Sequence, residues 1–353
     1  MDNFIYNGLP TRVIFGSGTR AEIEAETRAL GISRALVLST PFQAELAEEV
    51  ASNLGTLAVG TYSGAAMHTP VDVTEEAVRV LGEHSADGVI SVGGGSTTGL
   101  GKAIALRTDV PQLVLPTTYA GSEMTNILGQ TEAGRKTTLR DPRVQPETVI
   151  YDVDLTMTLP QGLSGTSGIN AIAHAVEALY AQDKNPVISL LASEGVAALY
   201  RGLPGIAADA GNVDARTDAL YGAWLCAICL ASSGVALHHK LCHVLGGSFD
   251  LPHAETHTVV LPQALAYNAP AVPDAMAQLR RAMNTDTPAA ALYDLAQQMG
   301  AETSLKALGM PEDGIEKAVS ITLENPYWNP RELSAVPIAA TLEAAWRGDR
   351  PEL

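Results

Sequence analysis

Short apolar runs alternate with helix-like segments in the first part of the chain. Apolar runs that suit buried strands lie at residues 35–39, 88–92, 112–116 and 148–152. Between them, residues 44–53 and 73–84 show the spacing of apolar positions that is typical of helices. Buried strands that alternate with helices build βαβ units, so the pattern predicts a parallel sheet.

The pattern changes after about residue 155, where strand-like runs almost disappear. Segments that favour a helix lie at residues 170–182, 187–200, 215–230 and 289–299. The run Leu159-Pro160-Gln161-Gly162 is typical of a turn and indicates a boundary. We therefore predict an α/β domain over residues 1–156 and an all-helical catalytic domain over residues 157–353, with a ligand cleft between them.

The composition is that of a globular protein with an acidic surface. Hydrophobic residues make up 46% of the 353 residues, and the net charge is −17. Such a field repels phosphate backbones and anionic lipid, so we expect neither nucleic acid nor membrane as a partner. Residues 219–239 contain no Asp, Glu, Lys or Arg. We interpret them as a buried core helix and not as a membrane span.

The cysteines and the N-terminus indicate a cytoplasmic protein. Three cysteines are too few for a disulfide framework and fit a reducing compartment. Cys226 and Cys229 fall inside a predicted helix without a second such pair, so we interpret them as packing residues. The first residues lack the basic and apolar regions of a signal peptide.

A glycine-rich turn follows the second predicted strand, with the sequence GGGSTT at residues 93–98. Consecutive glycines let the backbone turn tightly and come close to a ligand, and the next helix offers free N–H groups. The run matches neither GxGxxG nor the P-loop. A pyrophosphate group is favoured over a plain turn, and it would be bound by Gly93, Gly94, Gly95, Ser96 and Thr97.

Two of the predicted strands are followed by hydroxyl residues. Thr117, Thr118 and Ser122 follow the third strand, at the edge where open α/β sheets bind ligands. The first strand is followed by Thr40, where sites that require NAD usually carry an acid against the ribose 2′-hydroxyl. Because no carboxylate stands there to repel a 2′-phosphate, we expect the protein to accept NADPH as well as NADH.

Six of the eight histidines lie between positions 174 and 257. Asn170 and His174 are four residues apart, as are His239 and His243, so each pair shares a helical face. A lone histidine is usually a core residue, but this cluster favours a metal site or a proton-transfer site. Three imidazoles and one oxygen suit Zn²⁺ or Fe²⁺, yet the oxygen at position 170 belongs to a neutral amide. We therefore expect that no metal is required.

These motifs together resemble those of a known family. The stretches that carry the resemblance are residues 15–18, 93–96, 116–118, 121–123, the Asn170/His174 helix, the histidine run and residues 329–331. The chain resembles the iron-containing (group III) alcohol dehydrogenases, which share their fold with glycerol dehydrogenase and dehydroquinate synthase. The resemblance implies an N-terminal dinucleotide-binding domain with a parallel sheet and an all-α C-terminal domain.

Residues 93–102, 119–123, 251–257 and 327–331 are most similar to one group within this family. Its members reduce the conjugated double bond of 2-maleylacetate to 3-oxoadipate during the degradation of aromatic compounds. The resemblance implies NADH or NADPH as cofactor, a dicarboxylate substrate and a homodimer. The alternatives are a metal-dependent alcohol or polyol dehydrogenase of this fold, a lyase like dehydroquinate synthase, and a binding protein without catalytic activity.

The resemblance also implies roles for individual residues. The positions of the family's metal site, an Asp and three His, are Asn170, His174, His239 and His253 here. His243 matches a residue beside the nicotinamide. We expect His243 and His253 to be the electrophile and the proton donor, in an order that the sequence leaves open. The expected residues of the substrate pocket are Asn170, His174, His239, Tyr119 and Lys136, the last as partner of a substrate carboxylate.

Overall fold

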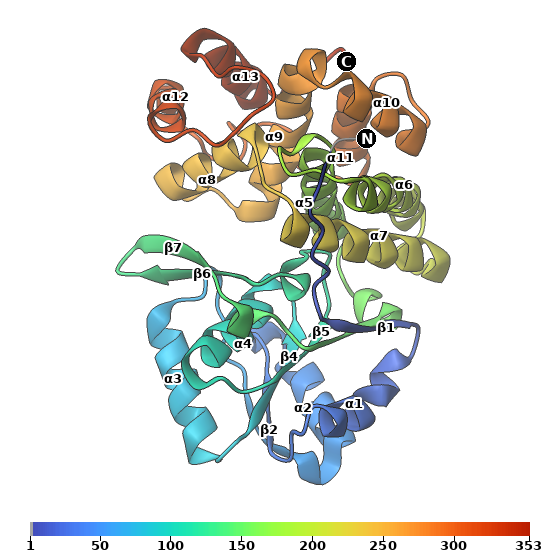
Figure 1. Cartoon of the computed structure of the whole chain (residues 1–353), viewed down its shortest axis with the longest axis vertical. Coiled ribbons are helices and arrows are strands. Elements are labelled where there is room, and N and C mark those ends of the chain that lie inside the picture. Colours follow the sequence, from blue (N-terminus) through green and yellow to red (C-terminus); the bar gives the residue numbers. More distant parts are fainter. Residues whose placement is uncertain (1–2) are drawn as a thin grey trace. The chain divides into compact units, whose positions relative to one another are not determined.

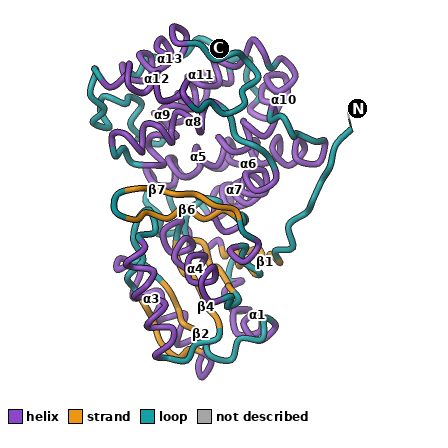
Figure 2. Tube along the Cα trace, turned by 60° about the vertical axis from the view of Figure 1, so that its left-hand side comes forward, coloured by secondary structure: helices purple, strands orange, loops and turns teal. Residues whose placement is uncertain are grey.

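The computed structural model describes residues 3–353, apart from the side chain of Lys136. The chain forms two compact units. One contains residues 8–159, and the other contains residues 160–353 together with residues 3–7. In Figure 2 the orange strands belong to the first unit, and the second is built from purple helices and teal loops.

The first unit contains a six-stranded parallel sheet with the order β1-β8-β5-β4-β2-β3. Its strands are β1 (Arg12–Gly16), β2 (Ala35–Leu38), β3 (Ala58–Tyr62), β4 (Gly88–Gly93), β5 (Gln112–Pro116) and β8 (Thr148–Asp152). The prediction of a parallel sheet is confirmed, and its four predicted strands are the four in the middle. The sequence analysis did not predict β1 and β3, which are the two edge strands.

Side chains alternate between the two faces of this sheet. On β2, Ala35 and Val37 pack with α1 (Ile23–Ala29) and α2 (Ala44–Leu54). Leu36 and Leu38 point to the other face. There they pack with residues of α3 (Val71–Glu83) and α4 (Gly95–Thr108). Figure 1 labels both helices. Both faces are covered, which explains why the central strands are continuous apolar runs.

A second sheet of the first unit is an antiparallel hairpin of β6 (Ile127–Glu132) and β7 (Arg135–Arg140). The sequence analysis did not predict it. Arg143 follows the hairpin and pairs with Asp141 at the surface, 2.7 Å between the charged atoms. Lys136, the expected carboxylate partner, lies on β7, but its side chain is outside the described part of the chain.

The described residues of the second unit form helices and connecting loops, without a strand. Its helices are α5 (Gln161–Tyr180), α6 (Pro186–Ala208), α7 (Val213–Ser232), α8 (Leu237–Phe249), α9 (His253–Asn268), α10 (Pro273–Met283), α11 (Pro288–Gln298), α12 (Gly314–Glu324) and α13 (Ala335–Arg347).

One expectation about the start of this unit was wrong. Gln161 and Gly162, which were expected in a turn, belong to the first turn of α5. The glycines that follow in α5 do not break it, because they are sites of close packing. A Cβ at Gly165 would lie 2.4 Å from Met299, and one at Gly168 would lie 2.9 Å from Leu203.

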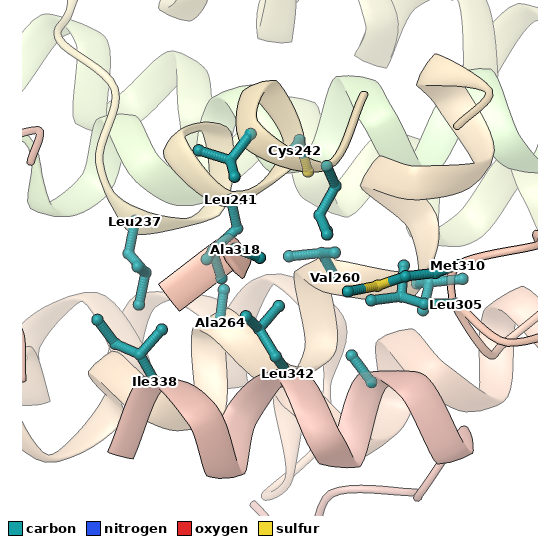
Figure 3. Close-up of a cluster of buried hydrophobic side chains, with 14 of the residues drawn as sticks. Leu237, Leu241, Cys242, Val260, Ala264, Leu305, Met310, Ala318, Ile338 and Leu342 are labelled. Atoms are coloured by element: carbon teal, nitrogen blue, oxygen red, sulfur yellow. The ribbon is translucent and has the colours of Figure 1, made fainter. Parts of the chain in front are cut away.

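The histidine-bearing helices α8 and α9 lie on an apolar core that they share with α12 and α13. Figure 3 shows Leu241, Val260, Ala318 and Leu342 converging from these four helices. All four side chains are almost fully buried. This packing fixes the rotation of α8 and α9 about their axes, and so it determines the direction in which their histidine side chains point.

The long uncharged stretch divides into α7 and the start of α8, with a break after Ser232. Among the described residues, no single helix has the length and hydropathy to cross a membrane. The pair α7 and α8 meets those criteria together, but the two are bent by 91° relative to each other. Cys226 and Cys229 are buried inside α7, as expected of packing residues.

Candidate active site

The residues expected to bind the cofactor gather at one edge of the first unit. Strands β2, β4 and β5 are neighbours and parallel, so their carboxyl ends lie together. Thr40 follows β2, the glycine turn follows β4, and Thr117 follows β5. The backbone N–H of Thr117 donates to the carbonyl of Gly93 over 3.1 Å, which joins two of these turns directly.

Gly93 excludes a side chain at the start of the glycine turn. Gly93 has a φ of +155°, and a Cβ there would lie 2.4 Å from Oγ1 of Thr97. At Gly95 a Cβ would be in ordinary van der Waals contact with Ala120, 3.8 Å away, so a small side chain would be tolerated there. Helix α4 begins here without a side-chain cap, and the buried hydroxyls of Thr97 and Thr98 lack a hydrogen-bond partner among the described residues. Free donors at the start of a long helix fit a phosphate group.

Gln43 joins the turn after β2 to the turn after β5. Its amide donates to the hydroxyl of Thr117 over 2.8 Å, and its carbonyl oxygen accepts from the hydroxyl of Thr40 over 3.3 Å. The sequence analysis missed Gln43, because only the proximity of β2 to β5 across β4 reveals its role. Thr40 therefore lies in a corner that it forms with the uncharged side chains of Gln43 and Thr117.

A buried lysine holds the loop that carries Ser122. The ammonium of Lys102, on α4, donates to the carbonyls of Ser122, Thr125 (2.7 Å) and Ile127 (3.0 Å). Burial lowers the pKa of Lys102 to about 7, and the nearby carboxylate of Glu123 opposes this shift. The lysine thus ties the loop to the helix that begins at the glycine turn. Tyr119, expected in the substrate pocket, is fully buried in the same loop.

The histidines of the second unit come together from three helices. His174 lies on α5, His239 and His243 lie on α8, and His253 is the first residue of α9. The rings of His174 and His239 stack with their centroids 5.2 Å apart, and those of His239 and His243 are 6.1 Å apart. His253 is connected to the others through His257. The ring centroid of His257 lies 4.3 Å from that of His253 and 5.0 Å from that of His239.

Burial separates these histidines into two classes. Burial lowers the pKa of His174, His238 and His257 well below the ordinary value, so their rings are neutral near pH 7. His243 and His253 are exposed. These two rings are accessible to solvent, whereas the rings of His174, His238 and His257 are buried and neutral.

Glu177, on α5, connects the start of α8 to the histidine cluster through hydrogen bonds. Its fully buried carboxylate accepts from the backbone N–H groups of Ala236 (2.7 Å) and His238 (2.8 Å) and from Nδ1 of His239 (2.7 Å). It therefore caps the N-terminus of α8 and fixes the tautomer of His239. The sequence analysis missed Glu177, although its place three residues after His174 on the same helical face was a signal.

The sequence analysis also missed His238, which lies on a different face of α8 from the pair His239 and His243. Its Nε2 is 2.9 Å from Nδ1 of His257 and 3.8 Å from the sulfur of Cys242. These three residues have ligand atoms within 4.8 Å of one another. The short nitrogen–nitrogen distance is that of a hydrogen bond between two neutral imidazoles.

Three of the residues at the family's metal positions have a possible ligand atom that makes no hydrogen bond among the described residues. Oδ1 of Asn170, Nδ1 of His174 and Nε2 of His239 are buried and have no hydrogen-bond partner among the described residues. The Asn170 amide carries no charge, burial lowers the pKa of His174 so that its ring is neutral, and the carboxylate of Glu177 is already engaged by three other donors. Iron(II) sites combine imidazoles with a carboxylate. The donor set therefore fits a divalent iron ion poorly.

Family models match both units. Residues 10–153 match the model of the iron-containing alcohol dehydrogenase, and residues 164–346 match that of the Fe-containing alcohol dehydrogenase family, C-terminal. The chain belongs to the iron-containing alcohol dehydrogenase family. The predicted resemblance and fold class are thus confirmed.

Several members of the iron-containing alcohol dehydrogenase family are similar over their full length. The maleylacetate reductase of Rhizobium sp. (strain MTP-10005) is 54% identical, with 100% of each chain covered. The maleylacetate reductase of Sphingobium indicum is 55% identical, with 99% of each covered. The crystal structure of maleylacetate reductase from Agrobacterium tumefaciens superposes with a TM-score of 0.96 at 53% identity, over 99% of this chain and 100% of that one.

Proposed function

We propose that this chain reduces the conjugated double bond of 2-maleylacetate to 3-oxoadipate, with NADH or NADPH as reductant. The observation that carries the proposal is the similarity to curated maleylacetate reductases, at 54% and 55% identity over essentially the whole length. The exposed imidazoles of His243 and His253, which belong to the histidine cluster of this unit, suit this reaction. The bound cofactor supplies the hydride that adds to the carbon β to the ketone.

The chain's own residues have two tasks in this reaction. The ketone oxygen gains negative charge as it becomes an enolate, and an N–H donor directed at it stabilises that charge. The α carbon then takes a proton from an acid. We assign these tasks to His243 and His253. The substrate carries two carboxylates in a protein of net charge −17, so local cations are also needed, and Lys136 stays our prediction for one of them.

We further propose that the reaction needs no metal. The support is the chemistry of the donors, since the oxygen at the family's metal position is an amide, Asn170. An N–H group of an imidazole can stabilise an enolate oxygen without a Lewis acid. No step of the mechanism above passes through a metal ion.

The test is a spectrophotometric assay of NADH oxidation with maleylacetate, on protein before and after exhaustive dialysis against EDTA. We expect turnover to 3-oxoadipate, and a rate after chelation within about twofold of the first. Absence of turnover with maleylacetate would refute the proposed function. Loss of activity on chelation, restored by Fe²⁺ or Zn²⁺, would refute metal independence alone. Metal-dependent oxidation of an alcohol instead would favour the alternative dehydrogenase.

The neutral corner at Thr40 predicts similar kcat/KM values for NADH and NADPH. Thr40→Asp places a carboxylate against the ribose, and it should lower kcat/KM for NADPH by about a hundredfold while leaving NADH nearly unchanged, because like charges repel by several kcal/mol. Thr40→Asn, which has the same shape without the charge, is the matched control. A wild-type preference for NADH above roughly a hundredfold, about 3 kcal/mol, would contradict this account of the corner.

A further inference from the structure

The segment between α12 and α13 is fastened to the histidine-bearing helices by Asn329. The side-chain amide of Asn329 donates to Oδ1 of Asn268 over 2.8 Å and to the carbonyl of Arg331 over 2.7 Å. Its oxygen accepts from Nδ2 of Asn268 over 3.0 Å and from the backbone N–H of Leu237 over 3.3 Å. This side chain thus joins the segment to the start of α8 and the end of α9.

Arg331 fastens the same segment a second time. Its guanidinium donates to the carbonyl of Tyr267 over 2.7 Å and lies 4.3 Å from the centre of the Tyr267 ring. The hydroxyl of Tyr267 donates in turn to the carbonyl of Glu332 over 2.6 Å. Tyr327, two residues before Asn329, is therefore held at a fixed place beside α8 although it lies outside any helix.

Tyr327 contacts two polar side chains of α8. Its hydroxyl is 3.0 Å from Nδ1 of His243, and the two rings meet edge to face with their centroids 6.0 Å apart. The ammonium of Lys240 lies over its ring, 5.4 Å from the centre. Burial, together with the charge of Glu177, raises the pKa of Tyr327 above its ordinary value, so the hydroxyl keeps its proton near pH 7.

We propose that Tyr327 is a positioning residue that donates its hydroxyl hydrogen bond to Nδ1 of His243 and so holds the proton of this imidazole on Nε2. The proposal rests on the proposed function, because His243 acts there on the substrate. With Nδ1 occupied as an acceptor, Nε2–H is the only donor of a neutral His243 ring. This assigns His243 as the donor that stabilises the enolate oxygen, and it leaves the proton transfer to the α carbon to His253.

The experiment compares Tyr327→Phe with wild type in steady-state assays with maleylacetate and NADH. Loss of the hydroxyl frees the tautomer and orientation of His243, so kcat should fall by about ten- to a hundredfold with KM for maleylacetate changed less than about threefold. Tyr293→Phe is the matched control. It also removes a tyrosine hydrogen bond from this unit, 2.8 Å to the carbonyl of Gly348, and it should keep kcat within about twofold.

A double-mutant cycle separates positioning through His243 from any other role. In a His243→Asn background, Tyr327→Phe should change kcat by less than about twofold, because the group that it positions is gone. An equal fall in both backgrounds would overturn the proposal. So would a single variant with unchanged kcat, or one in which only KM rises. If wild type itself does not reduce maleylacetate, the proposed function fails, which is a separate result from any of these.

Discussion

Replacing His253 with alanine should lower kcat for maleylacetate by about 10²- to 10⁴-fold, the range that a general acid contributes. His253 is exposed at the first position of α9, and it is the remaining exposed imidazole of the cluster once His243 is assigned to the enolate oxygen. The buried histidines cannot replace it, since burial holds the pKa of His174, His238 and His257 far below the ordinary value. The fall should appear in kcat, with the Kd of NADH from fluorescence titration unchanged.

Chemical rescue makes this prediction specific for proton transfer. Because His253 is exposed, added imidazole can enter the space that the alanine leaves, and it should restore part of the rate in proportion to the concentration of its protonated form. His84→Ala, at the end of α3 in the other unit, is the control and should keep kcat within about twofold. A fall of less than fivefold for His253→Ala, or a rise in KM alone, would show that another group protonates the substrate.

Glu177→Ala should lower the free energy of unfolding of the helical unit by about 3–5 kcal/mol. The substitution leaves the backbone N–H groups of Ala236 and His238 and one nitrogen of His239 without their acceptor in a buried place. Each unpaired buried donor costs about 1–3 kcal/mol, and α8 also loses the negative charge at its N-terminus.

Urea unfolding followed by circular dichroism measures this loss. Glu177→Gln should also be destabilised, because an amide offers a single oxygen where the carboxylate offers two and brings an NH₂ group against the donors. Glu343→Gln is the control, since Glu343 is exposed on α13 and pairs with Arg347 at 3.8 Å. Surface pairs of this kind contribute about 0–1 kcal/mol. An unfolding midpoint for Glu177→Ala equal to that of this control would contradict the central role given to Glu177.

The sequence predicted the middle of the sheet well and its edges poorly. Strands β2, β4, β5 and β8 are covered on both faces or enclosed by neighbours, so they are written as continuous apolar runs. Strand β3 contains Gly60 and Thr61 and is only half-buried, so its composition does not differ from that of a loop. The hairpin of β6 and β7 contains several charged residues, which hid it in the same way.

The residues of the candidate site also fall into two groups, those that the sequence indicated and those that it did not. Local signals, namely a run of glycines and histidines at helical spacing, indicated residues such as Gly93, His174 and His243 without any structure. Residues whose role depends on a distant partner were missed. Glu177 is 62 positions away from His239, and Gln43 is 74 positions away from Thr117. Only the folded chain shows that such residues hold the chemical groups in place.

The lysine behind the glycine turn has a consequence for how a nucleotide reaches this edge. Lys102 binds three carbonyls of the segment after β5, so it ties that segment to the middle of α4 before any ligand arrives. Because this edge is already ordered, binding a nucleotide requires little further ordering of the protein. Most of the entropy lost on binding is therefore that of the nucleotide. Association should accordingly be a single fast phase in stopped-flow traces. Differences in affinity among related nucleotides should then arise mainly from their dissociation rate constants.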